Sequence, residues 1–348
     1  MRTLTALILL LTTGNLYSQP VLKSRLDSFF HHQPAGQPGF VLSIEKHGEI
    51  IYRNAVGEGL DTTTNFRMAS VTKQFTAMAI LLLEKNGALS VDDPIGRWFP
   101  ELPARIGKTV KVRHLLTHSS GLLDYETLIP DSQTTQVLDA DILRLLSTHD
   151  STLFTPGARF RYSNTGFCLL ALIVERASHQ KFPEYIRENI FRPLHMDSSA
   201  VYEPNAHIPR RAMGYPADQS VTSATKGDGG VYTSITDYAK WIKALQQNRL
   251  INLPATIHRL AFPITGNHNS FYAAGWFEST TPPLLLFHSG STCGFTNNAV
   301  QSPGDELTII FFSNLADNNQ PFHTIVRILK EEGLIDASPV FALHDLTR

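Results

Sequence analysis

The segment Ser70-Val71-Thr72-Lys73 places a hydroxyl and an amine three residues apart, just before an apolar run over residues 75–83. In a helix, this spacing brings both side chains to one face while the opposite face is buried. A serine alone is a weak nucleophile, and a partly desolvated lysine can lose its proton near neutral pH and act as its base. The segment therefore predicts Ser70 as a nucleophile with Lys73 beside it.

The spacing Ser-x-x-Lys occurs four times, starting at Ser43, Ser70, Ser178 and Ser223. Ser43 lies in a predicted strand, where an odd spacing sends the two side chains to opposite faces. We expect Ser178, at a helix end, and Ser223, in a polar loop, to be solvated. Only Ser70 opens a long apolar helix, which ends at Asn86-Gly87. There its backbone N–H would be free to bind an oxyanion, although a serine that merely begins the helix is an alternative.

A second polar group, Tyr162-Ser163-Asn164, stands at the entrance of another apolar helix, predicted over residues 164–178. A tyrosine hydroxyl near an ammonium can relay a proton, and an amide can orient both a substrate carbonyl and a lysine. A core aromatic with a satisfied hydroxyl is the alternative for Tyr162. Tyr52-Arg53-Asn54 has the same spacing, but it lies in an edge hairpin, where Tyr52 is expected to pack against a neighbouring strand.

The third group, His288-Ser289-Gly290-Ser291, lies on or at the end of a predicted strand. Its small residues would let a substrate lie along the strand edge and pair with it through main-chain hydrogen bonds. The backbone N–H of Ser291 would then supply a second oxyanion donor. Taken alone, the group also describes a plain turn at a strand end.

The elements that must position these groups follow a simple order along the chain. A hairpin over 40–46 and 49–56, and strands over 284–287, 294–301 and 307–313, are predicted at the two ends, followed by a helix over 321–332. Helices are predicted between them over 140–148, 164–178, 183–191 and 237–247. This order predicts an α/β (α+β) fold, with one antiparallel sheet built from about 19–90 and 225–348 and a mainly helical region over about 91–224.

Composition excludes several functional classes. The 348 residues are 42% hydrophobic and 18% charged, which is typical of a globular protein of one or two domains. The net charge of -1 and the absence of a basic block argue against a nucleic-acid partner.

The first 18 residues are predicted to be a signal peptide, with the domain over 19–348. Arg2 supplies a positive charge, residues 4–11 are apolar, and Leu16-Tyr17-Ser18 precedes a plausible cleavage site. A buried N-terminal helix is the alternative. This run is too short to span a bilayer, and no later run reaches about 18 apolar residues. We therefore expect export to a bacterial periplasm or medium and no membrane span.

Two further patterns leave alternatives open. Cys168 and Cys293 could form one disulfide in an oxidising compartment, although two buried thiols are favoured. His114 and His118 have the i,i+4 spacing that can chelate zinc on a helix, but no Glu follows His114 as the His-Glu-x-x-His motif requires. We therefore predict no metal and no cofactor. A Ser-His-Asp hydrolase is disfavoured as well, because the sequence contains no Gly-x-Ser-x-Gly elbow.

Taken together and in this order, the three polar groups resemble the serine β-lactamase and penicillin-binding-protein superfamily. The resemblance is closest to its class C-like branch of esterases, D-aminopeptidases and DD-peptidases, and it covers almost the whole mature chain. Residues 114–122, 193–196 and 229–234 look like further recurrent segments of that family. The resemblance implies an antiparallel sheet flanked by helices, with the active site in a cleft beside a helical region.

The resemblance also implies a role for each residue. Ser70 attacks a carbonyl and becomes acylated, Lys73 and Tyr162 share the acid and base roles, and Asn164 orients the substrate and Lys73. The N–H groups of Ser70 and Ser291 form the oxyanion hole, and water releases the acyl group. Whether Lys73 or Tyr162 takes the proton stays open, because the two groups titrate together.

One departure from the family pattern bears on the substrate. Many β-lactamases and transpeptidases have Lys at the position of His288, where its charge holds a substrate carboxylate. A largely neutral His288 makes this recognition weaker, unless an arginine elsewhere replaces it. We expect an esterase, a D-aminopeptidase or a DD-carboxypeptidase acting on a small molecule or short peptide, with at most weak β-lactamase activity. His288, Ser289, Gly290, Ser291 and Asn164 are the predicted substrate-binding residues.

The loops over 124–139 and 202–226 are expected to shape the substrate pocket. A monomer is the default oligomeric state.

The alternative function is that of a catalytically silent relative, which binds peptidoglycan fragments or a protein partner through the same cleft. An intact set of Ser70, Lys73, Tyr162 and Asn164 favours the enzyme, because a binding module needs no base beside its serine.

Overall fold

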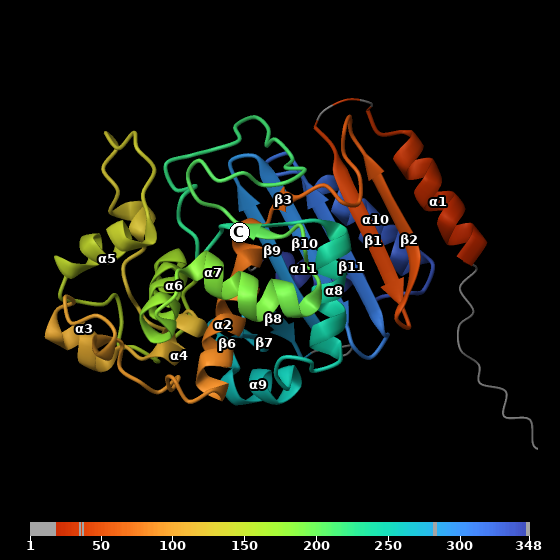
Figure 1. Cartoon of the computed structure of the whole chain (residues 1–348). Helices are drawn as coiled ribbons and strands as arrows, with labels where there is room; N and C mark the ends of the chain where they lie inside the picture. Colours follow the sequence, from red (N-terminus) through yellow and green to blue (C-terminus); the bar gives the residue numbers. More distant parts are fainter. Residues whose placement is uncertain (1–18, 35, 37, 281–283, 346–348) are drawn as a thin grey trace, which may run out of the picture.

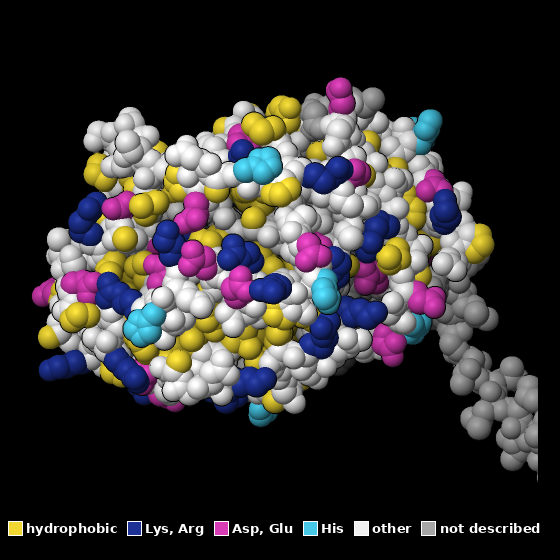
Figure 2. All heavy atoms as spheres, in the orientation of Figure 1, with side chains coloured by type: hydrophobic (Ala, Val, Ile, Leu, Met, Phe, Trp, Pro, Cys, Tyr) yellow, Lys and Arg dark blue, Asp and Glu magenta, His cyan; other side chains and the backbone are white. Residues whose placement is uncertain are grey.

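A computed structural model describes residues 19–34, 36, 38–280 and 284–345, so the predicted signal peptide lies outside the described residues. A large antiparallel sheet has helices on both faces, and a mainly helical region lies beside it (Figure 1). On the face seen in Figure 2, basic and acidic side chains are interspersed, in keeping with the net charge of -1. No helix among the described residues is long and apolar enough to cross a membrane.

The sheet confirms the predicted fold class. Its eight strands run in the order β2-β1-β11-β10-β9-β8-β7-β6, and each neighbouring pair is antiparallel. The first hairpin joins the last strand, with Phe40 opposite Ser313, so the two ends of the domain share one sheet. The strand bounds are β1 Phe40–Lys46, β2 Glu49–Val56, β6 Phe262–Ile264, β7 Asn267–Ala273, β8 Trp276–Ser279, β9 Leu285–Thr292, β10 Phe295–Ser302 and β11 Leu307–Ser313.

Helices cover the two faces of this sheet. The helices α1 (Gln19–His31), α10 (Gln320–Glu331) and α11 (Ala337–Asp345) pack together on one face, and α8 (Ile235–Gln246) covers β1 and β11 on the other. The α10 helix buries Phe322, Ile325, Val326, Ile328 and Leu329, a spacing of three and four that forms one apolar stripe. At the start of α8, Ser234 caps the helix by accepting a hydrogen bond from the Asp237 N–H at 3.1 Å.

The helical region is built around α6. Helix α2 packs against it, as do α4 and α5. The remaining bounds are α2 Lys73–Lys85, α3 Ala104–Thr109, α4 Val112–Leu116, α5 Asp139–Ser147, α6 Asn164–Ser178, α7 Phe182–Ile186 and α9 Leu253–Leu260, with short strands β3 Phe66–Arg67, β4 Ala200–Val201 and β5 Val231–Thr233.

Several predicted boundaries change. The helix predicted over 183–191 divides into α7 and a π-helical turn, Arg187–Phe191. The strand predicted over 284–287 continues as β9 to Thr292, so the whole His288 group lies within a strand. Tyr52 was predicted to pack against a strand, but it packs against Phe30 of helix α1 and donates a hydrogen bond to Asp27 of the same helix.

The two cysteines do not form a disulfide, and only one of them is buried. Cys168 and Cys293 are both free thiols. Cys168 is buried in α6 as predicted, whereas Cys293 is only half-buried because it lies in the turn between β9 and β10.

Ser223 was predicted to be solvated, but it is buried. Its Oγ accepts a hydrogen bond from the Ser220 N–H, and its carbonyl accepts one from Arg67. A sequence-local loop pattern could not reveal this packing against β3.

A buried carboxyl group joins the helical region to the loop before β5. Asp139, at the start of α5, accepts hydrogen bonds from the N–H groups of Lys226 and Gly227. Burial, together with the nearby Asp228, raises the pKa of Asp139 from 3.8 to about 7. The folded state therefore retains a proton that the unfolded chain loses, so this group's contribution to stability is lost as the pH rises from about 4 to about 7.

We expect Asp139→Asn to remove this dependence, because an amide does not titrate. The free energy of unfolding of the wild type should fall, relative to that of Asp139→Asn, between pH 4.5 and pH 7.5, as measured by urea denaturation. Asp150→Asn, at an exposed position, is the control and should track the wild type. A wild type and Asp139→Asn with parallel pH profiles would contradict a raised pKa at Asp139.

Candidate active site

Ser70 lies in a 3₁₀ turn, Ala69–Thr72, that leads directly into α2. Ala69 has a φ of 47°, in the left-handed region that residues other than glycine adopt rarely. Strand β9 packs closely on this turn at Gly290. A Cβ atom on Gly290 would lie 2.3 Å from the Met68 carbonyl oxygen and 3.0 Å from the Ser70 nitrogen. Only glycine therefore allows β9 to approach the Ser70 backbone this closely.

Lys73 is fully buried and connects the first two polar groups. Its Nζ donates hydrogen bonds to Ser70 Oγ at 3.0 Å, to Asn164 Oδ1 at 2.8 Å and to the Asp228 carbonyl oxygen at 3.0 Å. These three acceptors match the three donors of an ammonium group. The protonated lysine is thus held in one position, and only its neutral form can accept the proton of Ser70.

Tyr162 lies beside this lysine. The Lys73 Nζ is 5.0 Å from the centre of the Tyr162 ring, which is a cation–π contact between the amine and the ring. The ring has two aromatic neighbours: it stacks on His118 with centroids 4.1 Å apart and lies nearly parallel to Phe277 at 6.2 Å. The structure therefore brings Ser70, Lys73, Tyr162 and Asn164 together, with Tyr162 lining the same cavity as Ser70.

His288 lies beneath the cleft rather than on its wall. It is 1% exposed, its Nδ1 is 2.6 Å from the Ser289 carbonyl oxygen, and its Nε2 is 3.1 Å from the Tyr272 hydroxyl. Because Nδ1 faces a carbonyl, Nδ1 carries the hydrogen and Nε2 accepts from Tyr272. Burial, and secondarily the Lys73 charge, lowers the pKa of His288 to about 3. The ring is thus neutral. His288 was predicted to bind substrate, but its side chain is buried and does not line the cavity beside Ser70.

The possible metal pair is also placed differently from the prediction. Helix α4 ends at Leu116, and His118 lies beyond it with a φ of 53°, so the two histidines do not share one helix face. The Nδ1 of His118 accepts the Ser163 N–H, and the Nδ1 of His114 accepts the Lys111 N–H, each at 3.1 Å. Within the described residues, no cluster of three or more His, Cys, Asp or Glu side chains is placed to hold a metal.

A cavity of about 720 Å³ opens beside Ser70. Strand β8 pairs with Leu285–Phe287 only, whereas β10 pairs with β9 as far as Thr292. The edge of β9 at Ser289, Gly290 and Ser291 therefore faces the cavity, where an extended substrate could add to the sheet. The lining residues are Ser70, Asp124, Glu126, Tyr162, Asn164, Ser289, Gly290, Ser291, Thr296, Asp317, Asn319 and His344.

Three carboxylate side chains in this lining were not predicted. Asp124, Glu126 and Asp317 line the cavity, and none of its described lining residues is Lys or Arg. Glu126 accepts a hydrogen bond from Asn164 Nδ2 at 3.1 Å. Burial raises the pKa of both Asp124 and Glu126. The only sequence signal was the position of Asp124-Tyr125-Glu126 at the start of a loop expected to shape the pocket.

One arginine lies close to the cavity, but it is committed to the interior. Arg67 is 2% exposed and its guanidinium contacts the rings of Tyr202 and Tyr232, at 5.5 and 5.9 Å from their centres. It donates a hydrogen bond to the Ser223 carbonyl at 2.8 Å. The recess that it lines beside Ser70 has a volume of about 60 Å³, which is room for a few water molecules. Arg67 lines this recess and not the main cavity, so it does not take the place of the lysine that many relatives have at the position of His288.

The comparisons with known proteins agree with this geometry. The Beta-lactamase family model matches residues 26–331. Penicillin-binding protein 4* of Bacillus subtilis (strain 168) is 30% identical over 325 residues, which cover 83% of this chain and 70% of that protein. Protein flp of Staphylococcus aureus (strain COL) is 27% identical, covering 86% of this chain and 64% of that protein. The chain thus spans about two thirds of the length of these relatives.

Solved structures show the same fold. A penicillin-binding protein from Bacillus halodurans has a TM-score of 0.74 and 25% identity, covering 88% of this chain and 98% of that one. The D-amino acid amidase from Ochrobactrum anthropi SV3, complexed with L-phenylalanine, has a TM-score of 0.73 and 23% identity. The match covers 90% of this chain and 98% of that one. The extent of the family match and these likenesses agree: the chain belongs to the Beta-lactamase family and is a serine hydrolase.

Proposed function

We propose that this chain is an exported hydrolase that forms an acyl-enzyme on Ser70 and cleaves amides or esters whose acyl part carries a free amino group. D-amino acid amides are the proposed substrate class. The observation that carries the proposal is the set of Asp124, Glu126 and Asp317 around a cavity that Ser70 also lines. Carboxylates attract an ammonium group and repel a carboxylate, so they select the charge of the substrate.

In the proposed reaction, Ser70 Oγ attacks the carbonyl carbon while its proton passes to neutral Lys73, and Tyr162 is proposed to share this role. The N–H groups of Ser70 and Ser291 stabilise the oxyanion. Collapse of the tetrahedral intermediate breaks the bond to the leaving group, which takes the proton. Water then attacks the acyl-enzyme by the same route, which releases the acid and restores Ser70. The contact of 3.0 Å between Lys73 Nζ and Ser70 Oγ supports the first step.

Substrates with a carboxylate near the scissile bond fit this cleft less well. His288 is neutral and buried, and Arg67 is buried against two tyrosine rings. We therefore rank β-lactams and acyl-D-Ala-D-Ala peptides below amides of free amino acids. The D-configuration is proposed from the likeness to the D-amino acid amidase, which shares the fold. Export is proposed from the signal pattern in residues 1–18.

A substrate panel tests this proposal. Rates are measured in parallel on D-Ala-p-nitroanilide, its N-acetyl derivative, L-Ala-p-nitroanilide, a short p-nitrophenyl ester, nitrocefin and an acyl-D-Ala-D-Ala peptide. We expect the highest kcat/KM among the amides for D-Ala-p-nitroanilide and a clear loss on acetylation. Turnover of the acyl-D-Ala-D-Ala peptide alone would overturn the proposed substrate class in favour of a carboxypeptidase.

Glu126→Gln should reduce selectivity for the free amine. A hydrogen bond between a substrate ammonium and a partly buried carboxylate contributes about 1.5–3 kcal/mol, so the ratio of kcat/KM for free over acetylated amine should fall about 10- to 100-fold. Glutamine keeps a side-chain oxygen that can accept from Asn164. An equal loss on both substrates would instead assign Glu126 to the positioning of Asn164.

A further inference from the structure

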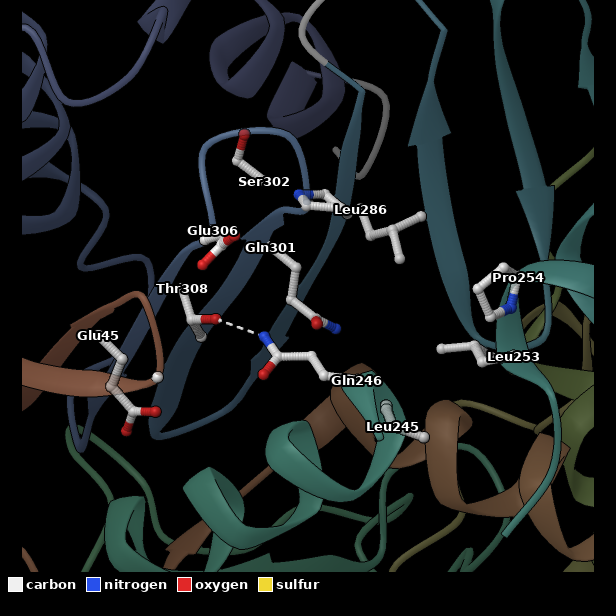
Figure 3. Close-up of a pocket in the computed structure, with 12 residues that line it drawn as sticks. Glu45, Leu245, Gln246, Leu253, Pro254, Leu286, Gln301, Ser302, Glu306 and Thr308 are labelled. Atoms are coloured by element: carbon white, nitrogen blue, oxygen red, sulfur yellow. Dashed lines mark hydrogen bonds between the residues drawn. The ribbon is translucent and has the colours of Figure 1, made fainter. Parts of the chain in front are cut away.

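A second cavity lies at the end of the sheet opposite to Ser70. The active-site cleft is at the end of β9 that carries Ser289 to Ser291, whereas this cavity contains Leu286 from the start of the same strand. Its volume is about 370 Å³, within the range of small-molecule sites. Figure 3 shows it between the sheet, the end of α8 and the start of α9.

The floor of this cavity is one row of side chains across four strands. Glu45 is paired with Thr308, Thr308 with Gln301, and Gln301 with Leu286, on β1, β11, β10 and β9. Residues paired in this way present their side chains on one face. Thr308 is 2% exposed and Gln301 is 4% exposed. A sheet face covered by a helix is normally apolar, so these buried polar side chains require an explanation.

Gln301 is the residue whose hydrogen bonds are incomplete. Its side chain extends from β10 into the space between Gln246, Leu253 and Leu286 (Figure 3). Its Nε2 is buried and has no hydrogen-bond partner among the described residues. The neighbouring Thr308 hydroxyl accepts a hydrogen bond from Gln246 Nε2 at 3.2 Å and not from Gln301. A buried donor without an acceptor is costly, and a ligand that supplies an acceptor would remove that cost.

The walls restrict what this ligand can be. Leu245, Leu253, Pro254 and Leu286 form an apolar side, which suits an aliphatic group. Glu45 and Glu306 also line the cavity, Glu45 in an ion pair with Arg53 at 3.0 Å, and none of the described lining residues is Lys, Arg or His, so the lining offers an anion no opposite charge. A glutamine amide both donates and accepts, so a second carboxamide is its natural complement and can form two parallel hydrogen bonds with it.

We propose that this cavity is a binding site, separate from the catalytic cleft, for a small neutral carboxamide that carries a branched aliphatic group. The ligand amide pairs with Gln301, and its aliphatic part contacts Leu253, Pro254 and Leu286. The proposal is independent of the reaction at Ser70, because none of these residues lines the catalytic cavity.

Saturation-transfer NMR with isovaleramide tests the site, using the Ser70→Ala protein so that the probe is not hydrolysed. We expect saturable binding with a Kd on the order of 1 mM, as befits so small a ligand. Isovalerate, which has the same shape but a negative charge at pH 7, should bind at least about fivefold more weakly. No binding of isovaleramide up to 20 mM, or equal binding of both probes, would overturn the proposal.

Two variants and a blocked cleft locate the signal. Gln301→Met keeps the side-chain length but removes the amide, and Leu253→Trp fills the apolar side. Each, combined with Ser70→Ala, should weaken isovaleramide binding at least about fivefold. Wild type labelled on Ser70 with a fluorophosphonate should bind the probe as before. Unchanged binding in both variants, or loss in the labelled protein, would contradict the site. Unaltered ester hydrolysis by Gln301→Met and Leu253→Trp with Ser70 intact verifies that both fold.

Discussion

Ser70→Ala is expected to lower the turnover of every substrate by about 10⁴-fold or more. Lys73 Nζ contacts Ser70 Oγ at 3.0 Å, and without that oxygen no acyl-enzyme can form. The measurement combines p-nitrophenyl ester hydrolysis with intact-protein mass after treatment with a fluorophosphonate or a penicillin. Wild type should gain the mass of the probe, and Ser70→Ala should gain none.

The chain offers a matched control for this experiment. Ser178 and Lys181 form another Ser-x-x-Lys pair, at the end of α6, where the Ser178 hydroxyl bonds to the Val174 carbonyl. Ser178→Ala should keep both labelling and turnover. An adduct that persists on Ser70→Ala would place the nucleophile elsewhere. No adduct and no ester turnover in the wild type would leave only the alternative function, a catalytically silent protein that binds peptidoglycan fragments or a protein partner through the same cleft.

Lys73→Met is expected to lower kcat by about 10²- to 10⁴-fold, the usual contribution of a general base. The variant removes the only donor that the structure gives to Ser70 Oγ and Asn164 Oδ1 among the described residues. It also leaves buried acceptors unpaired, which costs about 1–3 kcal/mol each in stability. Thermal unfolding must therefore be measured beside kcat, with rates taken below the Tm. Lys181→Met, at an exposed position, is the matched control and should leave kcat unchanged.

The Lys73 variant should also change how stability depends on pH. Burial and the Lys73 charge hold the pKa of His288 at about 3, below its ordinary 6.5. The stability that this neutral histidine contributes is present above about 6.5 and is lost as the pH falls towards 3. Without the Lys73 charge, that pKa should rise, and the loss between pH 6.5 and pH 4 should be smaller. Greater acid sensitivity of Lys73→Met than of the wild type would contradict this electrostatic coupling.

Tyr162→Phe separates the two candidate bases. If Lys73 takes the proton, Tyr162→Phe should lower kcat less than Lys73→Met does. If the order is reversed, Tyr162 is the base and Lys73 serves to hold its charge. Because the two groups lie in contact, the double variant should show less than the sum of the two losses.

Much of the fold follows from local patterns. The alternation and turns of the first hairpin and the last strands predicted a sheet joined from both ends, and the pairing of Phe40 with Ser313 confirms it. The apolar run after Asn164 predicted α6 with the bounds that the structure has. By contrast, β7 begins Asn267-His268-Asn269-Ser270, which has no apolar alternation to announce a strand. Its pairing with β8 depends on tertiary contacts rather than on its own sequence.

For the site, the sequence predicted Ser70, Lys73, Tyr162 and Asn164 as one group, and it placed Ser70 and Lys73 together at a helix start, as the structure has them. Only the tertiary structure decided which way the third group points. His288 is buried and does not line the cavity, whereas Ser289, Gly290 and Ser291 line it where β8 has stopped pairing with β9 at Phe287. Strand side and register depend on partners distant in the chain, and so does the gathering of Asp124, Glu126 and Asp317 around Ser70. Spacing within one segment encodes local geometry, whereas burial and charge environment arise only when separate segments meet.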